Sequence, residues 1–233
     1  MKQKYIQKKV AVFDIDGTIF RSSLLRELLE NLISAGVFPS RAKEYYAHAY
    51  INWLDRRGSY EQYLAGVIGA YERYIKGVQQ HVVWDMAHHV MDFHQNRVYK
   101  FTRDLVRDLQ KKGYYLLAIS GSPFDIVDPF ARNMGFDKVY GRLFEVDKSE
   151  RFTGKILYEG MIDHKGQILK RAIAKERLTL KDSIGVGDTD SDISFLKLVD
   201  RPIAFNPNIK LYSYAKKKKW DIVVERKDVT YTP

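Results

Sequence analysis

Residues 10–19 read VAVFDIDGTI. Four apolar residues run directly into Asp14 and Asp16, and Gly17 and Thr18 follow the second aspartate. A run of Val and Phe of this kind is typical of a buried strand. A carboxylate at the end of a buried strand costs several kcal/mol unless a cation compensates for its charge. The aspartate pair therefore indicates a functional site at the end of a core strand.

Length and composition are those of a soluble globular chain. The 233 residues are 45% hydrophobic and 29% charged, and they include no cysteine, which excludes disulfides and thiolate zinc sites. No apolar run approaches the roughly 20 residues that span a bilayer, and residues 1–10 are basic without the apolar block of a signal peptide. We expect a cytoplasmic protein without a membrane partner, and the sequence leaves the oligomeric state open.

The net charge of +10 invites a nucleic-acid partner. Half of the excess lies within residues 203–220, where Lys210 and Lys216–Lys219 occur without an acidic residue, and the remainder is dispersed. A short lysine run is typical of a solvated helix end. We therefore do not expect nucleic acid to be the partner, and a basic nucleic-acid-binding protein stays as the alternative to an enzyme.

From residue 100 onward, helices and strands alternate. The amphipathic stretch 101–113 predicts a helix, and YYLLAIS at 114–120 predicts a buried strand with Ser122 as N-cap of the next helix. The alternation favours an α/β fold with a Rossmann-like, doubly wound parallel sheet. Further elements are expected at 138–158 (short strands or a hairpin), 164–178 (helix), 182–188 (strand), 191–199 (helix), 201–206 (strand) and 221–225 (strand).

Residues 19–100 do not follow this alternation. Four helical stretches, punctuated by glycines and Pro39, fill the segment between the first strand and the helix at 101–113. We interpret residues 19–100 as an inserted, all-helical cap subdomain. Residues 1–18 and 101–233 then form the α/β core.

Three predicted strands end in polar residues: DIDGT at 14–18, SGS at 120–122 and GDTDSD at 187–192. In parallel sheets, ligands bind beyond the carboxyl ends of the strands, so these groups should meet. Their carboxylates would repel one another without a divalent cation, and oxygen ligands without Cys or His favour Mg²⁺. Lys165 and the backbone amides after Ser120 would complete a phosphate pocket. The pattern indicates Mg²⁺-assisted phosphoryl chemistry.

These motifs resemble those of the haloacid dehalogenase superfamily. DIDGT at 14–18 is similar to its DxDxT signature, and Ser120, Lys165 and GDTDSD at 187–192 are similar to its second, third and fourth motifs. The order is that of the family, and the motifs span most of the chain. The insertion at 19–100 resembles a C1-type cap, and Ser120 to Pro123 resembles the second motif of the phosphoserine phosphatase-like branch.

The resemblance implies a phosphatase mechanism. Asp14 would be the nucleophile that forms an aspartyl-phosphate, and Asp16 would be the general acid and base. Lys165 would offset charge on the nucleophile and the phosphate. The expected activity is Mg²⁺-dependent hydrolysis of a small phosphate ester. Phosphoserine phosphatase proper and a phosphotransferase are the alternatives within this class.

The binding residues follow from the same resemblance. The phosphate-binding set is expected to be Thr18, which supports the loop, together with Ser120, Gly121 and Lys165. The Mg²⁺ set is expected to be Asp14, the carbonyl of Asp16, Asp188 and Asp192, with Asp192 holding metal-bound waters or Lys165.

Substrate contacts are expected from the insertion. Phosphoserine phosphatases place an acidic residue nine positions after the nucleophile, where this chain has Ser23, so phosphoserine is in doubt. A second anionic group on the substrate would suit the arginines of this segment, or they lie on a solvated face: Arg21, Arg26, Arg56 and Arg57. Tyrosines between 45 and 74 either pack the helical core or stack on a ring-bearing substrate.

Overall fold

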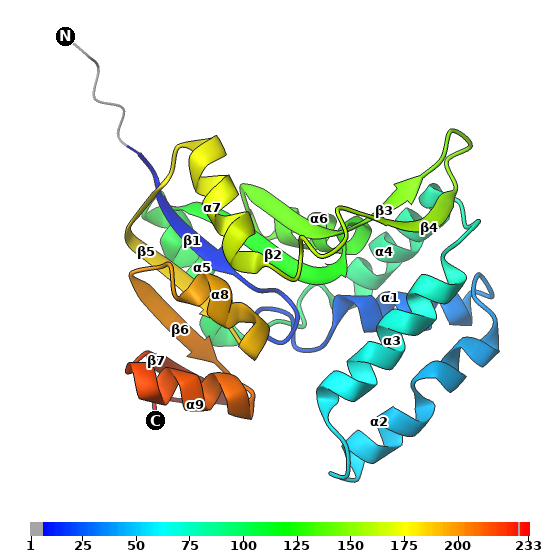
Figure 1. The fold of residues 1–233 in the computed structure, drawn as a ribbon, viewed down its shortest axis with the longest axis horizontal. Helices are drawn as coiled ribbons and strands as arrows, with labels where there is room; N and C mark the ends of the chain where they lie inside the picture. Colours follow the sequence, from blue (N-terminus) through cyan, green and yellow to red (C-terminus); the bar gives the residue numbers. More distant parts are fainter. Residues whose placement is uncertain (1–6, 228) are drawn as a thin grey trace.

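The centre of the molecule is an eight-stranded sheet (Figure 1). The computed structural model describes residues 7–227 and 229–233, so residues 1–6, on which part of the signal-peptide expectation rests, lie outside it. The strands are β1 (Lys9–Phe13), β2 (Tyr115–Pro123), β3 (Lys138–Val146), β4 (Phe152–Leu157), β5 (Thr179–Gly187), β6 (Arg201–Phe205), β7 (Asp221–Arg226) and β8 (Val229–Tyr231).

The strand order is β4-β3-β2-β1-β5-β6-β7-β8, which places β1 among the central strands. The pairs from β3 to β7 are parallel, and Val12 lies between Leu117 of β2 and Gly185 of β5. The predicted α/β fold is thus confirmed. The two edge strands are antiparallel: β4 forms the predicted hairpin with β3, and β8, which the sequence did not indicate, pairs with β7.

Alternate residues of β1 serve two separate hydrophobic cores, as the period-two geometry of a strand requires. Val10 and Val12 pack with α7 (Lys165–Glu176), α8 (Ile193–Leu196) and α9 (Ile209–Lys218) on one face. Ala11 and Phe13 pack with α5 (Lys100–Lys111) and α6 (Phe124–Asn133) on the other. Helices on both faces explain why β1 is apolar throughout.

A helical insertion separates β1 from α5 and β2, as predicted. It contains α1 (Leu24–Ser34), η1 (Ser40–Tyr45), α2 (Ala47–Leu54), α3 (Tyr60–Tyr74) and α4 (Gln80–His94). Helix α4 packs on α1 and α6, whereas α2 and α3 project from the sheet (Figure 1). Leu28, Val67 and Val90 belong to the same buried cluster as Phe13 of β1, so the insertion shares a core with one face of the sheet.

The lysine run lies at the end of a helix, as expected. Lys216, Lys217 and Lys218 occupy the last turn of α9, where the unpaired carbonyls attract cations, and Lys219 ends the helix in a left-handed conformation. All four side chains are exposed. No helix of the described residues is long and apolar enough to cross a membrane.

The predicted N-cap residue of α6 is wrong. The residue before α6 is Pro123, and Ser122 belongs to β2. The hydroxyl of Ser122 instead accepts a hydrogen bond from the Leu25 amide at 3.3 Å and donates one to Asp16 at 2.8 Å. Ser122 therefore links the sheet to the first helix of the insertion.

The core that the insertion shares with the sheet leads to a prediction about stability. Leu28 of α1 is fully buried, so Leu28→Ala should lower the free energy of unfolding by about 2–5 kcal/mol through the lost transfer energy and the cavity. Because the insertion and the sheet share one cluster, urea unfolding followed by circular dichroism and by tryptophan fluorescence should show coincident transitions. Phe93→Ala, at a side chain that is 72% exposed, is the matched control. Separate transitions would contradict the shared core.

Candidate active site

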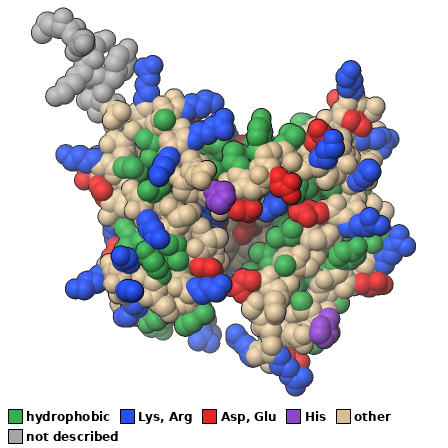
Figure 2. All heavy atoms as spheres, viewed as in Figure 1, with side chains coloured by type: hydrophobic (Ala, Val, Ile, Leu, Met, Phe, Trp, Pro, Cys, Tyr) green, Lys and Arg blue, Asp and Glu red, His purple; other side chains and the backbone are tan. Residues whose placement is uncertain are grey.

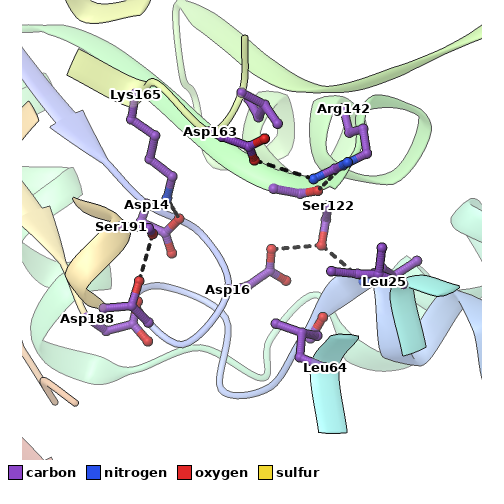
Figure 3. Close-up of a pocket in the computed structure, with 15 residues that line it drawn as sticks. Asp14, Asp16, Leu25, Leu64, Ser122, Arg142, Asp163, Lys165, Asp188 and Ser191 are labelled. Atoms are coloured by element: carbon purple, nitrogen blue, oxygen red, sulfur yellow. Dashed lines mark hydrogen bonds and ion pairs between the residues drawn. The ribbon is translucent and has the colours of Figure 1, made fainter. Parts of the chain in front are cut away.

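Loops from three neighbouring strands converge at one edge of the sheet (Figure 3). Asp14 and Asp16 follow β1, Ser120 lies near the end of β2, and Asp188 follows β5. The amide of Asp14 donates to Val186 of β5 at 3.0 Å, which continues the sheet ladder as far as the aspartate. Parallel pairing of β2, β1 and β5 thus brings together residues that are more than 170 positions apart in sequence.

Lys165 is the charge partner of two of these carboxylates. Its Nζ lies 2.5 Å from Asp14 Oδ1 and 2.6 Å from Asp192 Oδ1, and all three residues are buried. Burial opposes the charge of the ammonium, but the carboxylates of Asp14 and Asp192 raise the pKa of Lys165 above its ordinary value. The lysine therefore stays charged, and its removal would leave two buried carboxylates without an opposite charge.

Asp192 has little capacity left for another ligand. Its Oδ2 accepts the amides of Asp188 and Thr189, both at 3.0 Å, while its Oδ1 accepts from Lys165. A Cβ on Gly187 would lie 2.5 Å from the Cβ of Asp192, so only glycine permits this close loop. Both oxygens of Asp192 thus serve to hold the loop after β5 and the ammonium.

Three carboxylates lie close enough to hold a metal ion. One oxygen from each of Asp14, Asp188 and Asp192 lies within 4.8 Å of the others. Within the described residues, Oδ2 of Asp14 and Oδ2 of Asp188 accept no hydrogen bond, while Asp188 Oδ1 accepts from Thr18 at 3.0 Å. These free, hard oxygens fit Mg²⁺.

Gly17 allows Asp188 to approach the loop after β1. Its φ of +81° is a left-handed conformation, and a Cβ would meet Asp188 Oδ2 at 2.2 Å. The side chain of Thr18 is fully buried beside Asp188, and its carbonyl accepts from Thr102 Oγ1 at 2.9 Å. Thr18 therefore positions the Asp188 carboxylate and ties the loop to α5.

Burial and mutual repulsion disfavour ionisation of the cluster in the absence of a metal. Burial, together with the charges of Asp192 and Asp16, raises the pKa of Asp14 to about 7, although Lys165 opposes this shift. Burial and the Asp14 and Asp192 charges also raise the pKa of Asp188 well above its ordinary value. A divalent cation would relieve the same repulsion.

The carboxylate of Asp16 points away from the other three. Oδ2 accepts from the hydroxyls of Ser120 at 2.6 Å and Ser122 at 2.8 Å, and Oδ1 accepts from the Leu24 amide at 2.5 Å. Leu24 is the first residue of α1, so the positive end of this helix faces Asp16. The Asp16 carboxylate is not part of the cluster, and a metal-binding role for its carbonyl stays a prediction.

These groups open onto a cavity of about 170 Å³, which we name the first cavity. Asp14, Asp16, Gly121, Lys165 and Asp188 line it, so most of the predicted phosphate and metal residues meet there. Ser120 is buried behind Asp16. The molecular face in Figure 2 is hollowed between the side that carries α3 and the side that carries α8 and α9.

One cationic residue of the first cavity, Arg142, was not predicted from the sequence. Arg142 of β3 lines it, donates from Nε to the Gly121 carbonyl at 3.4 Å, and pairs with Glu72 of α3 at 3.5 Å and Asp163 at 3.6 Å. The available signal was a charged residue in the middle of the strand, between Gly141 and Leu143. The apolar part of the cavity wall consists of Leu25, Leu64, Ile68 and Ile162.

The three predicted substrate residues lie in different places. Ser23 lines the first cavity, where it is buried and caps α1 through the Arg26 amide. Arg21 lines a second cavity of about 560 Å³. Arg56 is exposed at the end of α2 and does not belong to the lining of either cavity.

Comparison with known proteins agrees with this arrangement. Residues 11–197 match the haloacid dehalogenase-like hydrolase family, and the chain belongs to that family. The matched segment contains all of the motifs that form the first cavity. The chain is therefore a haloacid dehalogenase-type hydrolase with a helical insertion between β1 and β2.

Among its relatives is the phosphoserine phosphatase of Methanocaldococcus jannaschii, 31% identical over 128 residues, which are 54% of this chain and 57% of that enzyme. The chain thus spans little more than half of that relative. The histidinol-phosphatase of Neisseria meningitidis is 24% identical over 93% of this chain and 98% of its own. A Bordetella pertussis protein of unknown function has the same fold, with a TM-score of 0.73, 20% identity, and coverage of 93% of this chain and 98% of its own.

The crowded carboxylates predict a pH-dependent response to Mg²⁺. A carboxyl whose folded-state pKa is raised contributes stability below its unfolded value of about 3.8, and this contribution is lost as pH rises through about 7. Mg²⁺ should therefore raise Tm more at pH 8 than at pH 5. Saturation at about ten times Kd adds about 1.4 kcal/mol, or a shift of several degrees, measured by differential scanning fluorimetry.

Asp188→Asn should remove most of this shift, because one of the two free oxygens at the cluster is lost. Asp104→Asn, at a partly exposed carboxylate of α5 outside the cluster, should leave it unchanged. An equal Mg²⁺ shift at both pH values, retained in Asp188→Asn, would place the metal elsewhere.

Proposed function

We propose that this protein is a Mg²⁺-dependent phosphatase that hydrolyses a small phosphorylated metabolite. The observation that carries the proposal is the contrast between Asp14 and Asp16. Asp14 faces Lys165 and the carboxylate cluster, whereas Asp16, two residues later, faces hydroxyls and the start of α1. Both line the first cavity, so a nucleophile and a proton carrier have separate environments within reach of one phosphorus atom.

The first step forms the aspartyl-phosphate. A carboxylate oxygen of Asp14 attacks phosphorus in line, the bond from phosphorus to the ester oxygen breaks, and the carboxyl of Asp16 gives its proton to the departing oxygen. Lys165 and the amides around Gly121 offset charge on the transferring group. Mg²⁺ held by Asp14, Asp188 and the Asp16 carbonyl, with Asp192 behind them, would neutralise negative charge when bound.

The second step restores the enzyme. Asp16, now ionised, takes a proton from water, whose oxygen attacks phosphorus and releases inorganic phosphate from Asp14. Water as the acceptor is part of the proposal. Release of the alcohol and of inorganic phosphate in equal amounts is the result that this acceptor requires.

Phosphoserine is not the substrate that this site favours. Ser23 occupies the position where phosphoserine phosphatases have an acidic residue that meets the amine of phosphoserine. Its hydroxyl caps α1 instead. The nearby Asp163 is paired with Arg142 and is largely exposed. The phosphoserine and histidinol phosphatases among the relatives support the reaction class and leave the leaving group open.

The substitution Asp14→Asn tests the proposed role of Asp14 as the nucleophile. The amide cannot attack phosphorus, so Mg²⁺-dependent hydrolysis of p-nitrophenyl phosphate should fall by about a thousandfold or more, and EDTA should abolish wild-type turnover. Asp104→Asn is the control for the loss of one surface charge. Release of p-nitrophenol and inorganic phosphate in equal amounts would identify water as the acceptor. Absence of turnover, together with salt-sensitive binding to RNA or DNA, would instead support a nucleic-acid-binding protein.

The proton role of Asp16 predicts a dependence on the leaving group. Asp16→Asn should slow formation of the aspartyl-phosphate by about 10²–10⁴-fold for glycerol 2-phosphate, whose alkoxide needs a proton. The loss should be much smaller for p-nitrophenyl phosphate, because p-nitrophenolate leaves without one. Single-turnover quench experiments measure this step separately from the later attack by water. Equal losses for both esters would refute the acid role and leave Asp16 as a structural partner of α1.

A further inference from the structure

The second cavity adjoins the first and is the larger of the two, with about 560 Å³ against about 170 Å³. Asp188 lines both cavities, and Gly17 of the loop after β1 lines the second. Its other walls come from the insertion and from the segment that returns from α4 to α5. The two cavities therefore adjoin at Asp188, where a substituent on a phosphate ester bound in the first cavity would enter the second.

One wall of the second cavity is aromatic. Tyr50 and Trp53 of α2 and Tyr60 and Tyr63 of α3 line it, and Tyr99 lines it from the start of α5. Trp53 and Tyr63 are stacked at 5.8 Å with an interplanar angle of 8°, and Tyr50 lies 5.0 Å from Tyr63. Tyr63 is buried, but the other rings remain partly exposed. Their open faces can stack on a planar ring and would gain its burial.

Tyr60 of α3 lines the second cavity. Its burial, and the charges of Asp16 and Asp188, raise the pKa of its hydroxyl above the ordinary value. The hydroxyl therefore stays protonated. Tyr60 therefore offers a neutral, ring-bearing side chain to a ligand in the second cavity.

Three arginines, Arg21, Arg26 and Arg97, line the second cavity together with the aromatic rings. Arg26 Nη1 and Arg97 Nη1 share one oxygen of the buried Glu27, at 3.2 and 3.1 Å. Arg21 pairs with no carboxylate among the described residues, and its guanidinium lies over the Tyr99 ring at 5.6 Å. The Nε of Arg26 is buried and has no hydrogen-bond partner in the described structure. Three guanidinium groups against two carboxylates, Glu27 and Asp188, leave an excess of positive charge that favours an anionic ligand.

From this combination we propose that the second cavity receives the leaving group of the substrate, and that this leaving group is an aromatic ring carrying a second anionic group. The ring stacks on Trp53 and Tyr60, and the anion pairs with Arg21. The inference rests on the proposed phosphatase function, because it assigns the substrate class of that same site. It also assigns Arg21 as a specificity residue for the anion.

A matched series of esters tests the assignment. Glycerol 2-phosphate has neither ring nor second anion, phenyl phosphate has the ring, 4-carboxyphenyl phosphate has both, and 4-(aminomethyl)phenyl phosphate carries the opposite charge. KM should fall from the first to the third, by about tenfold or more on adding the carboxylate, and should rise again for the cationic ester. KM values that do not depend on the ring and its charge would overturn the proposal.

Variants assign the effect to residues. Arg21→Gln should raise KM for 4-carboxyphenyl phosphate about tenfold, with kcat and the KM for phenyl phosphate little changed. Arg73→Gln, at an exposed arginine of α3, is the matched control. Trp53→Leu should raise KM for both aromatic esters, whereas Trp84→Leu, at a partly exposed tryptophan of α4, should not. A KM unchanged in both Arg21→Gln and Trp53→Leu would overturn the assignment.

Binding without catalysis separates this inference from the phosphatase proposal. 4-Hydroxybenzoate, the dephosphorylated product of the third ester, should quench tryptophan fluorescence in the wild type and in Asp14→Asn. The quenching should be lost in Trp53→Leu and weakened in Arg21→Gln. Quenching without turnover of any ester would overturn the phosphatase proposal, and with it the role of the ring as a leaving group. Turnover of the small esters without quenching would overturn only the proposal that the second cavity binds the leaving group.

Discussion

The contact on which the site depends is the ammonium of Lys165 between Asp14 and Asp192. Without it, the apolar strand β1 would end in a buried carboxylate with no opposite charge, which the core could not support. The lysine begins α7, which packs on the face of the sheet served by Val10 and Val12. Correct packing of that helix therefore sets the charge balance at the end of β1.

Asp16 connects this charge balance to the insertion. Its carboxylate accepts the first amide of α1, Ser122 accepts the second, and Ser23 accepts the third. The unpaired amides at the start of the helix are thus satisfied by residues of the two catalytic loops. A change in the protonation of Asp16 alters one of these bonds, so the proposed proton carrier also stabilises the first helix of the insertion.

The strand ends were predictable because their chemistry is local in sequence. Apolar runs ending in DID, SGS and GDTD locate β1, β2 and β5, and parallel pairing then brings their ends together. Arg142 was not predictable in this way, because its role depends on the register of β3 beside β2 and on the position of Glu72 in α3. The predicted N-cap role of Ser122 failed for the same reason, since a local rule competed with a tertiary partner, Asp16.

The two cavities are built from different parts of the chain. The groups proposed to handle phosphate come from loops fixed by the sheet, whereas the aromatic and cationic walls of the second cavity come from α1, α2, α3 and the segment before α5. These elements pack on one face of the same sheet through a common core, so the two walls hold a fixed position relative to Asp14. A side chain in α2 or α3 can therefore change without disturbing the carboxylate cluster, which allows the leaving group to be selected independently of the phosphoryl chemistry.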